Sequence, residues 1–234
     1  MQDFFANCAT VLQKYGFSYL RGAGTTLLLA LVGTFFGCLI GFAVGALQTI
    51  PVDKQRDPVW KRVLLKILHI FLRCYVELFR GTPMIVQAVF IYYGLLQVFG
   101  IKMGMWQAGF FIVSINTGAY MAETVRGGIV SIDPGQTEGA KAIGMNHWQT
   151  MLHVILPQAL RTAFPTLAST LIAMVKDTSL ANVIANKDII MMAKEYSAKG
   201  LIWPLFSTAV FFLVFVGALT LLFGWLEKRL DYFK

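Results

Sequence analysis

Charged residues are scarce in this sequence. Asp, Glu, Lys and Arg together make up 14% of its 234 residues, whereas a soluble domain carries about 25%. Hydrophobic residues account for 57% of the chain. This shortage of charge excludes an ordinary soluble domain, because too little polar surface is available to face water.

Cysteine and histidine are also rare, with three of each. Their spacing matches no zinc, redox or metalloenzyme pattern, so we expect no metal site. The sequence has no GxxxxGK[ST] phosphate loop, and we expect no ATP or other cofactor in this chain. It also lacks GxSxG, HExxH and paired catalytic aspartates, so we do not expect an enzyme.

The apolar residues that are present lie in runs close to the roughly 20 residues that a helix needs to cross a bilayer. Lipid cannot satisfy free backbone N–H and C=O groups, so such runs must be helical. We predict an all-α integral membrane protein, a single domain over 1–234. The segment Val63 to Phe79 mixes charged and apolar residues, as an interfacial helix or the cytoplasmic half of a long helix does. The five predicted transmembrane helices are 22–48, 84–99, 106–125, 163–184 and 201–226.

The net charge of +8 orients the chain and does not indicate a nucleic-acid partner, because the basic residues lie between the apolar runs. They cluster at 54–66, after the first run, and at 228–234, after the last. Cytoplasmic loops collect Lys and Arg, so we expect the C-terminus and the polar segment 126–162 inside and the N-terminal segment 1–21 outside. The loop after the fourth span is the exception, since it carries Lys187, Lys194 and Lys199.

A regular series of glycines runs through the first span. The four are spaced as three successive GxxxG units, which places them on one helical face where another backbone can approach closely. We predict a helix–helix seam, within the subunit or between subunits, and name it the glycine seam. Its members are Gly33, Gly37, Gly41 and Gly45.

The polar segment 126–162 is punctuated by glycine and proline. Pro134 is well placed at the first position of a helix, and residues 137–143 can form a short helix that Gly144 ends. Asn146 is a suitable N-cap for a second helix, 147–156, which Pro157 is expected to interrupt. Two short helices joined at a glycine would form a compact knob.

Polar residues at membrane depth form a further set of candidates. Such groups are costly in lipid and normally face a bundle interior, a cavity or each other. One interpretation is a pathway that meets an amino acid, with Glu123 or Asp177 attracting its ammonium and Lys176 its carboxylate. The other is structural, with Lys176 pairing with Glu123 or Asp177 to hold helices together. The set comprises Asn116, Tyr120, Glu123, Lys176 and Asp177.

A break is expected where Pro83 removes a backbone donor and Gly81 relaxes the chain. The residues Arg80, Gly81, Thr82 and Pro83 can act as a hinge or a constriction of a pathway. They can equally mark a simple helix start with Pro83 in its first turn.

Several blocks give the chain a specific resemblance. Glu138-Gly139-Ala140, Gly144 and Pro157 have the spacing of the EAA coupling loop of ABC importer permeases, with Gly139 where the family usually has alanine. More narrowly, the chain resembles the permease subunits of polar amino acid importers. The supporting blocks are 77–83, 116–129 and 176–180.

This resemblance implies a type I ABC importer fold with a cytoplasmic coupling helix, in the cytoplasmic membrane of a bacterium. It implies that Glu138, Gly139, Ala140, Gly144 and Pro157 belong to the part that docks on an ATPase. The expected partners are two ATPase subunits that bind ATP and Mg, a second permease that is identical or related, and an external binding protein. The cargo would be a polar amino acid such as glutamine, glutamate, arginine, histidine or cystine.

The resemblance adds Thr178 and Ser179, within the block 176–180, to the substrate pathway or gate. The alternative function is a secondary transporter or channel that works without an ATPase. The absence of a visible internal repeat weakens it, since such transporters often contain repeats.

Overall fold

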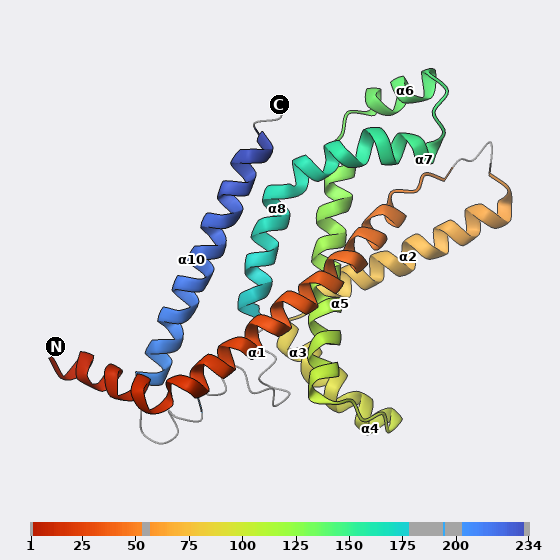
Figure 1. Ribbon diagram of the computed structural model, residues 1–234. Coiled ribbons are helices and arrows are strands. Elements are labelled where there is room, and N and C mark those ends of the chain that lie inside the picture. The colour runs from red at the N-terminus through yellow and green to blue at the C-terminus, as the bar shows by residue number, and fades with distance from the viewer. Residues whose placement is uncertain (1, 53–56, 178–193, 195–202, 232–234) are drawn as a thin grey trace.

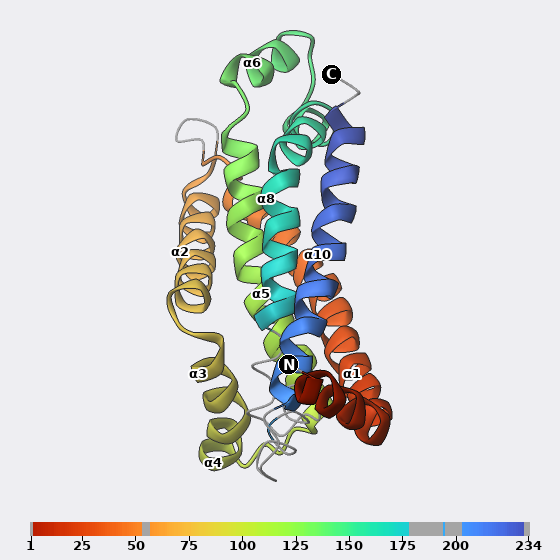
Figure 2. The ribbon, with the colours of Figure 1, turned by 90° about the vertical axis from the view of Figure 1, so that its left-hand side faces the viewer.

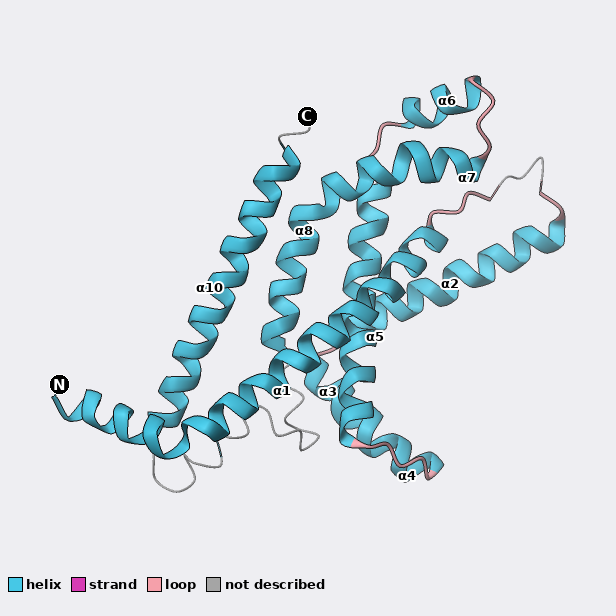
Figure 3. Ribbon diagram, in the orientation of Figure 1, coloured by secondary structure: helices cyan, strands magenta, loops and turns pink. Residues whose placement is uncertain are grey.

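The computed structural model describes residues 2–52, 57–177, 194 and 203–231. In these residues it contains helices and loops and no strand (Figure 3), so the predicted all-α class is confirmed. The helices are α1 (Gln2–Gln48), α2 (Val59–Gly81), α3 (Met84–Val89), α4 (Leu95–Phe99), α5 (Met105–Val130), α6 (Pro134–Ala142), α7 (His147–Thr150), α8 (Leu156–Asp177) and α10 (Trp203–Asp231), with π-helical segments η1 (Phe90–Gly94) and η2 (Met151–Ile155).

Helix α5 is the centre of the molecule. It packs against α1, α2 and α8, while α10 lies beside α8 at the edge (Figures 1 and 2). Its buried residues occur all around the helix; Ala119, Met121 and Ala122 are each completely buried. A helix without a single apolar stripe is typical of an element enclosed by others.

Two stretches of the described chain are individually long and apolar enough to cross a membrane, Gly16–Gln48 and Thr208–Leu226. The pair Val59–Gly81 and Met84–Phe99 adds a third if it forms one bent span. The predicted spans 106–125 and 163–184 fall on α5 and α8, which contain more polar residues. The number of five spans therefore stays a prediction.

The structure moves several predicted boundaries. The segment 1–21 is helical from Gln2 and continues directly into the first span, as α1. The span 84–99 consists of α3, η1 and α4 in succession. The fourth helix begins at Leu156 and not near residue 163, and residues 178–184 lie outside the described chain. Helix α10 continues beyond residue 226 to Asp231.

The glycine seam lies against α5, so its partner belongs to the same chain. A Cβ atom at Gly37 would lie 3.1 Å from Ser114 O, and one at Gly45 would lie 2.7 Å from Ala122 O. Any larger side chain would therefore meet backbone atoms of α5, and only glycine permits this approach.

Pro157 does not interrupt its helix, contrary to the sequence-based expectation. Residues 147–177 remain helical, and the π-helical segment η2 ends two residues before the proline. In an α-helix, the ring of Pro157 would clash with the carbonyl of His153, four residues earlier. His153 lies within η2, where the wider π-turn changes that register. The proline is thus accommodated without ending the helix.

Candidate functional site

The chain bends by 110° between α2 and α3, at the break predicted from residues 80–83. Thr82 and Pro83 both have extended backbone, with ψ of 143° and 136°, and α3 begins at Met84. The break and the helix start therefore coincide, because Pro83 ends one helix and precedes the next. This bend leaves the last carbonyl groups of α2 without partners in their own helix.

Thr82 Oγ1 donates to one of these carbonyls, Leu78 O, at 2.7 Å, and Gln87 donates to another, Phe79 O. The side-chain Nε2 of Gln87 donates to Phe79 O at 2.9 Å, to Thr82 O at 2.9 Å and to Thr82 Oγ1 at 2.8 Å. Asn116 of α5 holds it in place by donating from Nδ2 to Gln87 Oε1 at 2.8 Å. Asn116 is buried, with 2% of its surface exposed. Its side-chain amide thus supports the bend, and Asn116 is not among the residues that line the two cavities described below.

A cluster of charges lies next to the bend. Glu123 accepts two hydrogen bonds from Arg126, from Nη2 at 2.6 Å and from Nε at 3.0 Å. Arg80 at the end of α2 approaches the same carboxylate at 4.0 Å and lies over the ring of Tyr120, 5.8 Å from its centroid. Glu123 therefore lies beside two arginines. In the structural interpretation of the sequence, Lys176 was one expected partner of Glu123.

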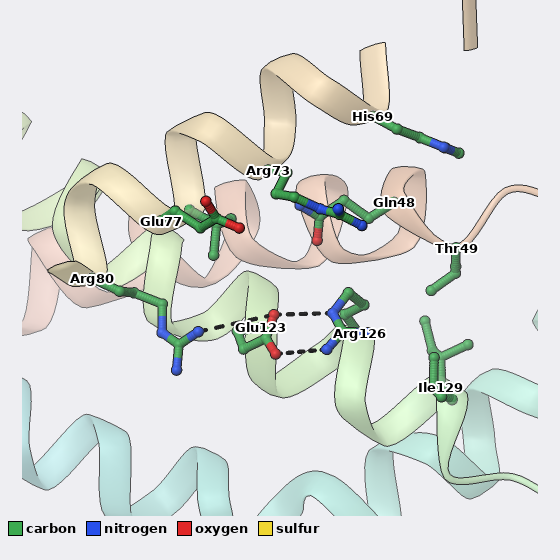
Figure 4. Close-up of a pocket in the computed structure, with 11 residues that line it drawn as sticks. Gln48, Thr49, His69, Arg73, Glu77, Arg80, Glu123, Arg126 and Ile129 are labelled. Atoms are coloured by element: carbon green, nitrogen blue, oxygen red, sulfur yellow. Dashed lines mark hydrogen bonds and ion pairs between the residues drawn. The ribbon is translucent and has the colours of Figure 1, made fainter. Parts of the chain in front are cut away.

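These charges line a cavity of about 530 Å³ between α1, α2 and α5 (Figure 4). Helix α2 contributes Arg73, Glu77 and Arg80 to it, and α5 contributes Glu123 and Arg126. Three guanidinium groups thus face two carboxylates. Gln48 of α1 also lines the cavity, and its buried Oε1 has no hydrogen-bond donor among the described residues. The arrangement can accept a small molecule that carries both charges.

A second cavity, of about 450 Å³, shares Arg80 and Glu123 with the first. Tyr120 lines it from α5, and hydroxyl groups of α8 line the opposite wall. The polar part of its lining therefore consists mainly of hydroxyl groups around one ion pair. The contributing α8 hydroxyl residues are Thr162, Thr166 and Thr170.

Lys176 and Asp177 end α8. Lys176 is exposed and Asp177 is half-buried. The lining residues of the two cavities include neither of them. Thr178 and Ser179 lie outside the described residues. The structure therefore brings Tyr120 and Glu123 together with Arg80, but it does not bring Lys176 or Asp177 into that group.

The knob predicted from residues 126–162 is present at one end of the molecule (Figures 1 and 2). Pro134 occupies the first turn of α6, whose N-cap Asp133 accepts a hydrogen bond from Gly135 N at 2.6 Å. Gly144, with φ of 85°, ends the helix. Met145 N donates to Ala140 O and Gly144 N to Lys141 O, as in a Schellman motif.

The second half of the knob starts with a capping box. Asn146 and Gln149 exchange side-chain to backbone hydrogen bonds of 2.9 Å each. On α6, Ala140 is buried, whereas Glu138 and Gly139 are exposed. Both helices of the knob thus carry caps formed within the knob itself, and Glu138 is exposed on its surface.

Sequence reasoning missed Gln87, Arg73 and Arg126. A signal existed for two of them, since Gln87 is a lone amide within an apolar run and Arg126 follows Glu123 by three residues, on the same helical face. Arg73 gave no such signal, because its place depends on how α2 packs across α5.

Comparison with known families places residues 60–232 within a family described as "Binding-protein-dependent transport system inner membrane component". Among characterised sequences, the chain is similar to "Glutamine transport system permease protein GlnP" of Escherichia coli K12. The two are 33% identical over 216 residues, which cover 90% of this chain and 92% of the relative. "Putative glutamine transport system permease protein GlnP" of Rickettsia felis is 29% identical over 213 residues, with 90% and 92% coverage.

Among solved structures, the chain is similar to one described as "Crystal structure of an amino acid ABC transporter with histidines". The TM-score is 0.82 at 30% identity, with 94% of this chain and 97% of the other covered. The inward-facing MetNI methionine ABC transporter has a TM-score of 0.75 at 21% identity, with 93% and 98% covered. The second likeness concerns the fold alone.

Proposed function

The chain belongs to the family of binding-protein-dependent transport system inner membrane components, and from this premise we propose that it carries a polar amino acid into a bacterial cell. It is the permease subunit of an amino acid ABC importer, and ATP hydrolysis is the task of a separate subunit. The proposed cargo class comprises glutamine, glutamate, arginine, histidine and cystine. The glutamine permease of E. coli K12, 33% identical to this chain, supports the choice.

The observation that carries this proposal is the 530 Å³ cavity with charges of both signs. An amino acid is a zwitterion, and its carboxylate would find a guanidinium among Arg73, Arg80 and Arg126. Its ammonium would meet Glu77 or the unpartnered Oε1 of Gln48. Because three arginines of the cavity face only two glutamates, the cavity should bind the carboxylate of the amino acid more strongly than its ammonium group.

Tyr120 and Glu123 are proposed to form the gate between the two cavities, since Glu123 and Arg80 line both. The 110° break at 80–83 would serve as the hinge that moves Arg80 toward or away from Glu123. The residues 176–179 are retained as a proposed part of the pathway beyond the described cavities.

Glu138, Gly139, Ala140, Gly144 and Pro157 are proposed as the coupling site for an ATPase dimer. The exposed Glu138 and the internal caps of the knob support this. The other proposed partners are a second permease, identical or related, and an extracytoplasmic binding protein. The knob and the C-terminus would face the cytoplasm and the N-terminus the outside.

The deciding experiment reconstitutes the permease with its ATPase and binding protein in liposomes and measures ATP-dependent uptake of radiolabelled glutamine, arginine, histidine, glutamate and cystine. We expect uptake of at least one of them and none when the ATPase is omitted. Uptake by this chain alone, driven by an ion gradient, would instead establish the secondary-transporter alternative.

The coupling site has its own test. Glu138→Lys places a reversed charge on the exposed face of α6 and should reduce uptake at least about tenfold, a loss of about 1.4 kcal/mol of coupling energy. Gln136→Lys adds one positive charge to the same helix at an exposed neighbouring position and serves as the control. Full transport by a normally expressed Glu138→Lys variant would remove Glu138 from the coupling site.

A further inference from the structure

Helix α2 carries a stripe of basic residues on a face that the transport proposal leaves largely unused. Arg62, Lys66, His69 and Arg73 follow one another at steps of four, three and four residues, which places them on one side of the helix. Only Leu65, Leu72 and Val76 are buried in α2. The helix is therefore fixed to the bundle along a narrow line and is open elsewhere.

The basic stripe lines a surface hollow of about 600 Å³. Its other lining residues are apolar, and Val59, Val63 and Ile70 are more than half exposed, at 66%, 51% and 55%. The hollow thus offers positive charge and apolar surface to the same occupant. His69 is anchored at its inner edge, with Nε2 3.1 Å from Leu47 O.

The charges of this hollow are not neutralised by the described protein. At the two ends of α2, Lys61 pairs with Asp57 at 2.5 Å and Arg80 approaches Glu123. Between them, no carboxylate of a described residue forms an ion pair with Arg62, Lys66 or Arg73. Arg62 Nε is buried and lacks a hydrogen-bond partner in the same part of the chain, a costly state unless a ligand supplies an acceptor.

The position of the helix limits what this ligand can be. The start of α2 lies at the same end of the molecule as the α6 knob (Figures 1 and 2). Trp60 and Phe71 are each 69% exposed on α2. Large aromatic residues beside basic ones on an amphipathic helix are typical of the interface between lipid tails and water.

We propose that this hollow binds the headgroup of an anionic phospholipid. Guanidinium groups hold phosphate through paired hydrogen bonds, so Arg62 would bind the phosphodiester, and Lys66 would add a point charge. Val59, Val63 and Ile70 would pack against the glycerol and the first acyl carbons. A soluble anion would satisfy the charges but would leave these three side chains in water, whereas a lipid covers both.

The test uses the complete importer in detergent micelles with spin-labelled phosphatidylglycerol or phosphatidylcholine, and measures the immobilised fraction of each lipid. The intact protein should prefer phosphatidylglycerol. The double variant Arg62→Gln/Lys66→Gln should lower that preference about thirtyfold, and Lys66→Gln alone, which changes an exposed residue, about fivefold. Lys228→Gln/Arg229→Gln removes the same charge from the end of α10 and should change the preference little.

Three results would overturn the proposal. The first is an unchanged lipid preference in the Arg62→Gln/Lys66→Gln variant, or an equal loss in the α10 control. The second is displacement of phosphatidylglycerol by inorganic phosphate in moderate excess, which would indicate a site for a free anion. The third is that a Val63→Cys variant cross-links to the ATPase while a photoactivatable phosphatidylglycerol does not label the hollow. This result would show that a protein covers the hollow.

Discussion

At the scale of single residues, Gln87 has the most consequential position. One side-chain amide provides donors for the end of α2 and for Thr82, and Asn116 fixes that amide from the central helix. The 110° bend after α2 therefore depends on two neutral side chains, of which only Asn116 was singled out from the sequence.

Replacing Gln87 should destabilise the protein. Gln87→Leu has a similar size but leaves the Thr82 carbonyl without its Gln87 donor and Phe79 O with only the 3.3 Å bond from Asn116 Nδ2, at a cost of about 1 to 3 kcal/mol. The melting temperature of the detergent-purified importer should fall, and uptake should fall with it. Gln97→Leu, at an exposed position of α4, is the control, and an equal melting temperature in the two variants would contradict this account.

Glu123 should behave differently, because its side chain remains 32% exposed beside Arg126 at 39%. Such a solvent-screened pair contributes about 1 kcal/mol or less to stability. Glu123→Gln should therefore leave the melting temperature nearly unchanged. Uptake should nevertheless fall at least about tenfold, since two guanidinium groups would remain without their shared carboxylate at the gate.

The variant Arg126→Gln and the double variant complete this comparison. If the Glu123–Arg126 ion pair only stabilises helix α5, the double variant should restore uptake. If Glu123 belongs to the gate, the double variant should stay inactive while melting normally. Normal uptake by Glu123→Gln would remove it from the gate altogether.

At the scale of helices, the glycine seam shows what a local pattern can and cannot reveal. The spacing of its glycines predicted a close helix contact correctly. It could not identify α5 as the partner, because the four residues carry no information about what approaches them. The polar knob was predictable in more detail, since Asp133, Asn146 and Gly144 act through bonds within a few residues. Pro157 was misjudged because a π-turn can absorb a proline.

The seam gives a clear prediction for Gly41. A Cβ atom there would overlap Met121 Cβ and would lie 2.9 Å from Ala122 N and 3.0 Å from Gly118 O. Because the last two are backbone atoms of α5, Gly41→Ala should cost about 1 to 3 kcal/mol of stability. Gly24→Ala on the same helix meets nothing within 4 Å and should be neutral or slightly stabilising, since alanine favours helix by about 1 kcal/mol. Equal melting temperatures would contradict the packing.

At the scale of the whole molecule, composition was enough to predict the all-α membrane class. It was not enough to confirm the number of spans. Helices α5 and α8 contain polar residues that contact other helices or line cavities, so their composition resembles a protein interior more than a lipid-facing surface. The cluster of Arg73, Arg80, Glu123 and Arg126 also could not be foreseen, because it joins two helices whose packing angle is not encoded in either one.

The proposed orientation can be tested with single cysteines in a background without Cys8, Cys38 and Cys74. Helix α6 and the loop between α4 and α5 lie at opposite ends of the molecule (Figure 1), and the positions chosen in them, Gln136→Cys and Lys102→Cys, are both exposed. A membrane-impermeant maleimide should label the second in intact cells, and the first only after permeabilisation. Labelling of Gln136→Cys in intact, transport-competent cells would reverse the topology and exclude α6 as a site for a cytoplasmic partner.

The backbone contact between α1 and α5 has a mechanical consequence. Over three helical turns the glycines of α1 lie directly against the side chains of Val113, Thr117, Met121 and Val125 and close to the α5 backbone, so neither helix can slide along the other without a collision. Only the short turn Ser131 to Asp133 separates α5 from α6. A displacement of α6 would therefore move α5 and α1 together as one rigid unit. Relative motion of the helices would then occur at the bend between α2 and α3, which Gln87 stabilises.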